Sequence, residues 1–168
     1  MYYINLFFLF SILGYIMESF WNLICKERFG SGILFLPWTP IYGFGACLIL
    51  VVFNLINNFS LPGWLNSIIL AFVMMILLTV LEFIGGTLIE KVFHKTFWDY
   101  RPFKYNFGKY ISLEISLIWA FSSVIFAYII EPIIKPFILR IHPCITITFI
   151  ILFILDNILT MTLGKVHK

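Results

Sequence analysis

The fold is decided by residues 82–106, which read EFIGGTLIEKVFHKTFWDYRPFKYN. They join the end of a long apolar segment to the most charged and aromatic loop of the chain. Glu82, Gly86 and Glu90 recur at every fourth position, so on a helix they form one polar line that descends towards the loop. A charged side chain inside a lipid-spanning helix costs about 2.5–3.5 kcal/mol on insertion scales. This line of acids therefore predicts a site.

The composition is that of a membrane protein. Of the 168 residues, 62% are hydrophobic and only 11% are charged, whereas soluble domains are about half apolar and about a quarter charged. Aromatic residues make up 20%, as expected for a chain with many bilayer–water boundaries. The net charge of +3 does not indicate nucleic-acid binding, because the cations lie in loops beside apolar spans.

Apolar length predicts an all-α integral membrane protein with a single polytopic domain, residues 1–168. Five stretches are long enough to cross about 30 Å of hydrocarbon. They are residues 2–25, 40–59, 64–90, 111–131 and 143–164. Residues 132–143, PIIKPFILRIHP, are expected to form a short segment lying in the membrane interface.

The distribution of Lys and Arg predicts the orientation. With five spans, the loops at 26–39 and 91–110 share a side with the C-terminus, and that side carries nine of the eleven basic residues. The nine are Lys26, Arg28, Lys91, Lys95, Arg101, Lys104, Lys109, Lys165 and Lys168. We expect a plasma-membrane protein, and by the positive-inside rule its N-terminus lies outside and its C-terminus lies in the cytoplasm.

Acids from four different spans are predicted to reach similar depths. Glu18, Glu82 and Asp156 each precede the basic cytoplasmic end of their helix by eight or nine residues, or roughly 12–14 Å. Glu114 lies somewhat shallower on the same side. We expect these acids, with Glu90, to line an acidic cavity in the cytoplasmic half of the membrane. Such a cavity suits a proton, a cation or an amine-bearing solute. The alternative is structural, with each acid accepting interhelical hydrogen bonds.

Two loops are candidates for a lid over that cavity. Residues 37–45, PWTPIYGFG, include Trp38, Tyr42 and Gly43 and form either a partly re-entrant segment or a proline-started helix with an interfacial aromatic anchor. In the second loop, Trp98-Asp99-Tyr100 and the nearby Asn106 form either a gate or an interfacial belt in which Asp99 pairs with a loop cation.

Other signals are weak or absent. Cys25, Cys47 and Cys144 lie in or beside different spans without a CxxC pair and are interpreted as small apolar residues rather than redox or metal groups. His94 is expected to be solvated. No removable signal peptide is predicted. No nucleotide-binding, zinc-protease, serine-hydrolase or deaminase motif is present, so we expect neither catalysis nor a bound cofactor.

Several motifs together resemble the bacterial ABC-transporter type IV, or CmpB-like, permease family, which has uncharacterised eukaryotic transmembrane relatives. The similar motifs are Gly14-Tyr15-x-x-Glu18, Pro37-Trp38-x-Pro40-Ile41-Tyr42-Gly43-x-Gly45, Glu82-x-x-x-Gly86-x-x-x-Glu90, Trp98-Asp99-Tyr100, Asn106-x-Gly108 and Leu117-x-Trp119. The resemblance covers nearly the whole chain. The family usually has Gly before Pro37 and a small polar residue at position 101, where this chain has Leu36 and Arg101.

The resemblance implies a permease-like membrane subunit. Because a five-span chain of 168 residues is small for a transport domain, an ABC role requires self-association and a separate ATPase subunit, for which the basic loops at 26–39 and 91–110 are the natural docking surface. Two alternatives are a non-transporting scaffold or regulatory subunit, and a membrane enzyme acting on lipid head groups.

Overall fold

The computed structural model describes residues 1–25, 30 and 32–163. These residues form helices and loops, with no strand among them beyond an isolated antiparallel bridge between Asn106 and Ser112. The basic residues Lys26, Arg28, Lys165 and Lys168, and the expected end of the last span at Gly164, lie outside this part of the chain. Contacts divide the chain into two compact units, residues 1–47 with 135–168 and residues 48–134.

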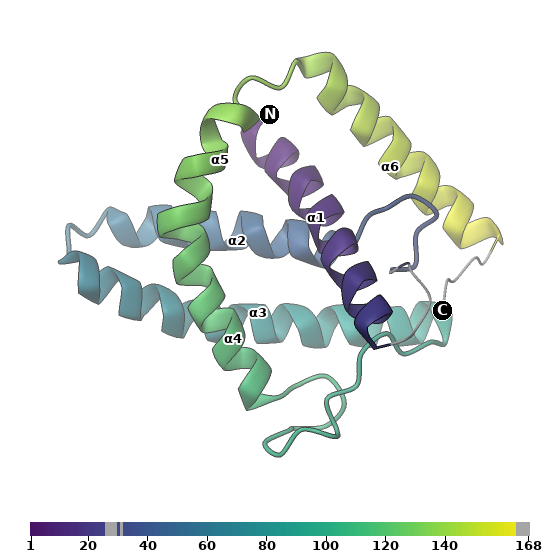
Figure 1. Ribbon diagram of the computed structural model, residues 1–168, viewed down its shortest axis with the longest axis horizontal. Coiled ribbons are helices and arrows are strands. Elements are labelled where there is room, and N and C mark those ends of the chain that lie inside the picture. The colour runs from purple at the N-terminus through teal and green to yellow at the C-terminus, as the bar shows by residue number, and fades with distance from the viewer. Residues whose placement is uncertain (26–29, 31, 164–168) are drawn as a thin grey trace. The chain divides into compact units, whose positions relative to one another are not determined.

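The first unit contains α1 (Tyr2–Ile24), α6 (Pro143–Leu163) and the start of α2 (Pro40–Asn57). The loop before α2 lies between α1 and α6 (Figure 1). Phe8, Leu34 and Trp38 form a buried apolar cluster, against which Phe149 and Phe153 of α6 pack. The Thr146 hydroxyl of α6 donates to the Asn5 side-chain oxygen of α1 over 2.6 Å. Close aromatic packing and one buried polar pair therefore join the two helices.

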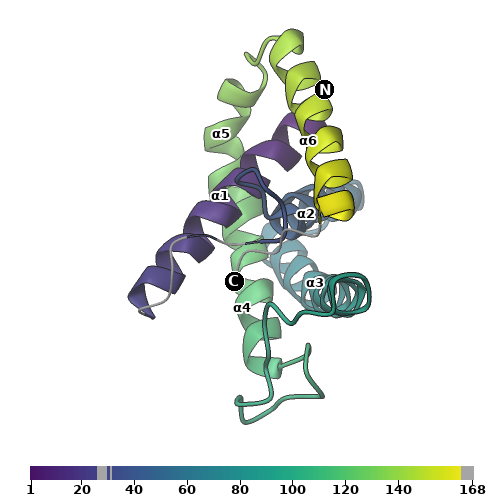
Figure 2. The same cartoon turned by 90° about the vertical axis from the view of Figure 1, so that its right-hand side faces the viewer.

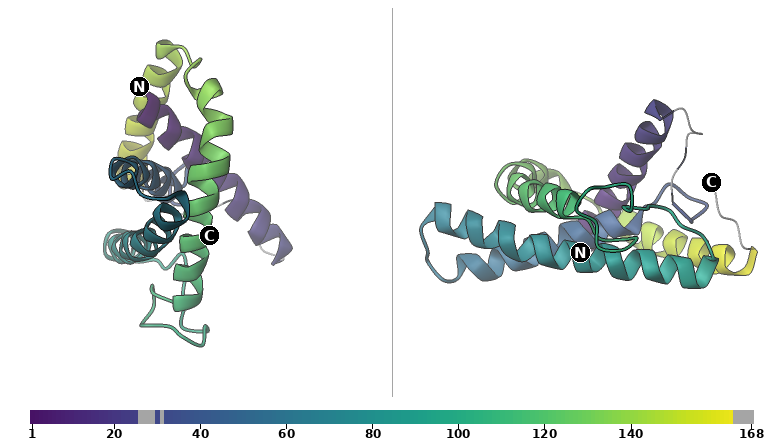
Figure 3. Two further views of the ribbon diagram at one scale, coloured as in Figure 1. Left: turned by 90° about the vertical axis from the view of Figure 1, so that its left-hand side faces the viewer. Right: turned by 90° about the horizontal axis from the view of Figure 1, so that it is seen from below.

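The second unit contains the rest of α2, α3 (Gly63–Phe93), α4 (Leu113–Ile125), a π-helical turn (Phe126–Ile130) and the first half of α5 (Glu131–Ile138). The C-terminal part of α2 and the following α3 form a hairpin, and α4 crosses α3 (Figures 1 and 2). Thr79 of α3 and Ser116 of α4 share a hydrogen bond of 2.6 Å. The loop of residues 94–112 leaves α3 and turns back before entering α4 (Figure 3).

Five helices are long and apolar enough to cross a membrane, as predicted, and the fourth is longer than expected. It runs from Leu113 to Ile138 through α4, the π-helical turn and α5, so most of the segment predicted to lie in the interface instead continues this helix. Pro132 lacks an N–H and cannot donate to the carbonyl one turn back. The π-helical turn directly precedes it, where the regular hydrogen-bond ladder is interrupted.

Candidate functional site

In the second unit, the loop of residues 94–112 forms hydrogen bonds with the two acids in the polar line of α3, Glu82 and Glu90. The Tyr100 hydroxyl donates to a Glu82 carboxylate oxygen over 2.7 Å, and Glu82 is only 7% exposed. Two turns further along α3, the Lys109 ammonium pairs with Glu90, and the Tyr110 hydroxyl donates to the same carboxylate over 2.8 Å. The acids of α3 therefore accept hydrogen bonds from two separate parts of one loop, around Tyr100 and around Tyr110.

Gly86 lies between these two carboxylates and gives the loop room to approach. A Cβ atom at this position would lie 2.6 Å from the Tyr110 ring, well inside van der Waals contact. The Tyr110 ring thus covers the α3 backbone where a side chain is missing, and its hydroxyl reaches Glu90. Burial raises the pKa of Tyr110, while the hydrogen bond to Glu90 raises the pKa of Lys109.

The loop also has its own internal bonds. Asp99 and Arg101 form a bidentate pair, and these hydrogen bonds lower the pKa of Asp99 to about 2. The Asn106 amide donates to the carbonyl oxygens of Arg101 and Phe103. Trp98 packs edge-on against Tyr110, and its buried indole N–H has no acceptor among the residues that the structure describes. Asp99 thus has the loop-cation partner expected of the interfacial alternative.

Glu114 holds the C-terminal part of this loop at the start of α4. Its carboxylate accepts a hydrogen bond from the Ser112 hydroxyl over 2.7 Å and another from the Tyr105 backbone N–H over 3.0 Å. A carboxylate in the first turn also interacts favourably with the helix dipole. These contacts give Glu114 a local role in ordering the entry into α4.

In the first unit, Asp156 of α6 anchors the loop that precedes α2. It accepts hydrogen bonds of 2.9 Å from the backbone N–H groups of Phe35 and Leu36 and from the indole N–H of Trp38. Asp156 is 2% exposed and Trp38 is 3% exposed. Three converging N–H donors compensate a carboxylate that would otherwise be costly to bury.

The remaining predicted lid residues of this unit are packed between helices. The α2 helix begins at Pro40, as in the proline-started alternative, although Trp38 is buried rather than placed as an exposed anchor. Tyr42 covers Gly14 of α1, and Gly43 lies against the Ser11 side chain and the Phe7 backbone. Glu18 is half-buried on α1.

The structure joins two of the predicted acids to predicted lid residues, Glu82 to Tyr100 and Asp156 to Trp38. Within the described ranges, no group of three or more His, Cys, Asp or Glu side chains is arranged to hold a metal ion. Sequence reasoning missed Lys109 and Tyr110, which it treated as a loop cation and an aromatic. The sequence did contain a signal for this contact. Lys109 and Tyr110 directly precede the predicted span 111–131, and Glu90 is the last residue of the polar line, where the preceding span ends. His94 is exposed, as expected.

One of three comparisons with known proteins gives a match. A sequence model of the family described as "Putative ABC-transporter type IV" matches residues 5–161. No curated protein and no solved structure matches the chain. Five span-length helices together with this match make the chain a multi-pass membrane protein.

Proposed function

Since the chain belongs to the family described as "Putative ABC-transporter type IV", we propose that it is a permease-like subunit that binds a proton, a cation or a cationic small solute at Glu82. The loop of residues 94–112 covers this site. In this proposal the chain resides in the plasma membrane and performs no catalysis, and a separate ATPase subunit hydrolyses the nucleotide.

The observation that carries the proposal is the hydrogen bond from Tyr100 to the buried Glu82 carboxylate. The Tyr100 hydroxyl comes from the loop, whereas Glu82 lies on the buried face of α3, so this bond fixes the loop to the helix. A proton or cation arriving at Glu82 competes with the phenol for the same oxygen atoms. Occupancy of Glu82 and closure of the loop are therefore coupled, because each changes the free energy of the other.

The other acids of this unit hold a later part of the loop. Glu90 pairs with Lys109, and Glu114 accepts from Ser112 and Tyr105 at the start of α4. All of these partners follow Tyr100 in the loop. Ligand binding at Glu82 would therefore release the part of the loop around Tyr100 while the part that enters α4 stays attached.

Hydrogen exchange of the loop amides tests this proposal. The full chain is placed in lipid nanodiscs and probed between pH 5 and pH 8, and then with potassium, magnesium or spermidine. After correction for the intrinsic pH dependence of amide exchange, we expect the protection of the amides of residues 94–112 to fall when the pH falls or when the effective cation is added. Glu82→Gln removes the response. The matched control, Glu114→Gln, loosens the same loop but preserves the response, because Glu82 is intact.

A loop that responds to none of these conditions in the folded wild-type protein refutes the proposal. That result favours a non-transporting scaffold, for which there is a specific observation: Glu90, Glu114 and Asp156 all hold loops against helices. In a scaffold, Glu82→Gln lowers stability or partner assembly and changes nothing else. Turnover of a lipid by the purified chain would instead indicate the lipid head-group enzyme.

A further inference from the structure

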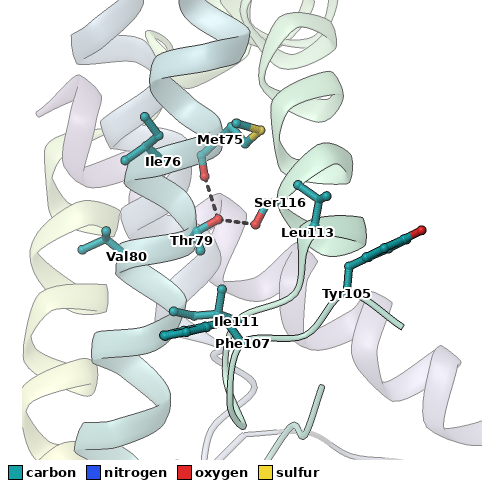
Figure 4. Close-up of a pocket in the computed structure, with 9 residues that line it drawn as sticks. All are labelled: Met75, Ile76, Thr79, Val80, Tyr105, Phe107, Ile111, Leu113 and Ser116. Carbon is teal, nitrogen blue, oxygen red and sulfur yellow. Dashed lines mark hydrogen bonds between the residues drawn. The ribbon is translucent and has the colours of Figure 1, made fainter. Parts of the chain in front are cut away.

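An apolar groove lies in the second unit between α3, the loop and α4 (Figure 4). Its volume is about 330 Å³, and it is lined by Met75, Ile76, Thr79, Val80, Tyr105, Phe107, Ile111, Leu113 and Ser116. Two of the three hydroxyl-bearing residues in its wall, Thr79 and Ser116, bond to each other and to backbone carbonyls. Its lining therefore offers an elongated ligand mainly apolar surface.

The position of the groove along the membrane normal follows from the length of α3. At about 1.5 Å per residue, the 31 residues of α3 extend roughly 46 Å, which exceeds the hydrocarbon thickness of about 30 Å. The stretch from Gly63 to Val80 already covers about 27 Å of that thickness. Since α4 begins beside Thr79, the polar loop of residues 94–112 lies alongside the rest of α3, where head groups begin. With the hydrocarbon taken to begin at Gly63, the groove lies at the boundary between acyl chains and head groups.

A cation lies beside this groove. The Lys104 ammonium is 5.1 Å from the centre of the Tyr105 ring, and Tyr105 lines the groove. The neighbouring cations Arg101 and Lys109 are paired with Asp99 and Glu90. Among the described residues, no carboxylate forms an ion pair with Lys104. An apolar groove next to this ammonium is complementary to a molecule with an apolar chain and an anionic head.

We infer that this groove binds one anionic phospholipid of the surrounding bilayer. An acyl chain lies against Ile76, Val80 and Phe107, and the phosphate lies at the Lys104 ammonium. The groove supplies shape rather than a hydrophobic driving force, because acyl chains outside it are equally apolar. Selection for an anionic lipid therefore comes from Lys104. This inference does not depend on ligand binding at Glu82.

Native mass spectrometry of the full chain, delipidated and titrated with phosphatidylglycerol or phosphatidylcholine, tests the inference. We expect one retained lipid and a preference of about fivefold for phosphatidylglycerol, since a basic residue near the surface attracts anionic lipid by about that factor. Lys104→Gln removes the preference, while Lys91→Gln, at an exposed lysine of α3 outside the groove, keeps it. Val80→Phe fills the groove and reduces retention of both lipids, whereas Ile68→Phe, at an exposed α3 position, leaves retention unchanged.

Three outcomes overturn the inference. The first is equal retention of the two lipids by the wild-type protein, and the second is a preference that survives Lys104→Gln. The third is Val80→Phe retaining as much lipid as Ile68→Phe. If Val80→Phe instead abolishes a dimer seen in the same spectra without changing lipid retention, a second copy of the chain occupies the groove. Circular dichroism confirms that each variant is folded.

Discussion

The Tyr100 hydroxyl lies 2.7 Å from the carboxylate of Glu82, eighteen residues earlier in the chain, and donates a hydrogen bond to it. This bond joins the first half of the loop to the buried face of a spanning helix. Tyr100→Phe removes this bond by deleting the hydroxyl oxygen alone.

Tyr100→Phe is expected to destabilise closure of the loop by about 1–3 kcal/mol, the cost of leaving a buried group without its partner. The ring remains and still packs edge-on against Phe103. Hydrogen exchange of residues 94–112 measures the effect. Tyr105→Phe is the control, because Tyr105 contacts Glu114 through its backbone N–H rather than its ring. Equal exchange in Tyr100→Phe and the wild type would contradict the prediction.

Gly86→Ala is expected to destabilise the protein by about 1–3 kcal/mol, the usual cost of overpacking. The added methyl group meets the Tyr110 ring, which is fixed by its bond to Glu90. Gly63→Ala is the matched control, since a Cβ atom there meets nothing within 4 Å. Thermal unfolding in detergent gives the stabilities. In a double-mutant cycle, Tyr110→Ala should relieve part of the Gly86→Ala penalty, and strict additivity would argue against this contact.

Asp156→Ala is expected to be the most destabilising substitution, because it removes the acceptor of three N–H groups at once. Each lost charge-assisted bond is typically worth about 1.5–3 kcal/mol, although such values are not additive. Trp38→Phe removes one donor and should cost less. Thr160→Val is the control, because its hydroxyl lies 3.5 Å from Asp156, at the limit of hydrogen bonding. Urea unfolding monitored by far-ultraviolet circular dichroism ranks the variants, and Thr160→Val falling below Asp156→Ala would refute this assignment.

The Asp99–Arg101 pair makes the stability of the folded protein depend on pH. The folded-state pKa of Asp99 is lowered from 3.8 to about 2, so its contribution to stability is fully present above pH 3.8 and is lost as the pH falls towards 2. Arg101→Gln should return the pKa of Asp99 towards 3.8. Carboxyl carbon chemical shifts in an NMR titration follow this change, and an unshifted midpoint in the variant would show that Arg101 is not its cause.

The native cysteines test the predicted orientation. Cys25 follows α1 and Cys144 is the second residue of α6, and both are exposed. With the N-terminus outside, Cys144 faces the exterior and Cys25 faces the cytoplasm. A membrane-impermeant maleimide added to intact cells should label Cys144, while Cys25 reacts only after lysis. Cys144→Ser and Cys25→Ser identify the labelled site, and the reverse pattern would invert the topology.

The sequence by itself determined the five spans, the polar line of α3 and the family. The length of an apolar segment decides whether it can cross the bilayer, and residue spacing decides which side chains share a helix face, and both are local properties of the chain. Only the tertiary structure decided which partner each acid has. Asp156 bonds to Trp38 from 118 positions away, and Glu90 bonds to a lysine and a tyrosine that spacing alone did not connect to it. A carboxylate in an apolar setting must be compensated, but the donor that does so depends on which distant segments pack together.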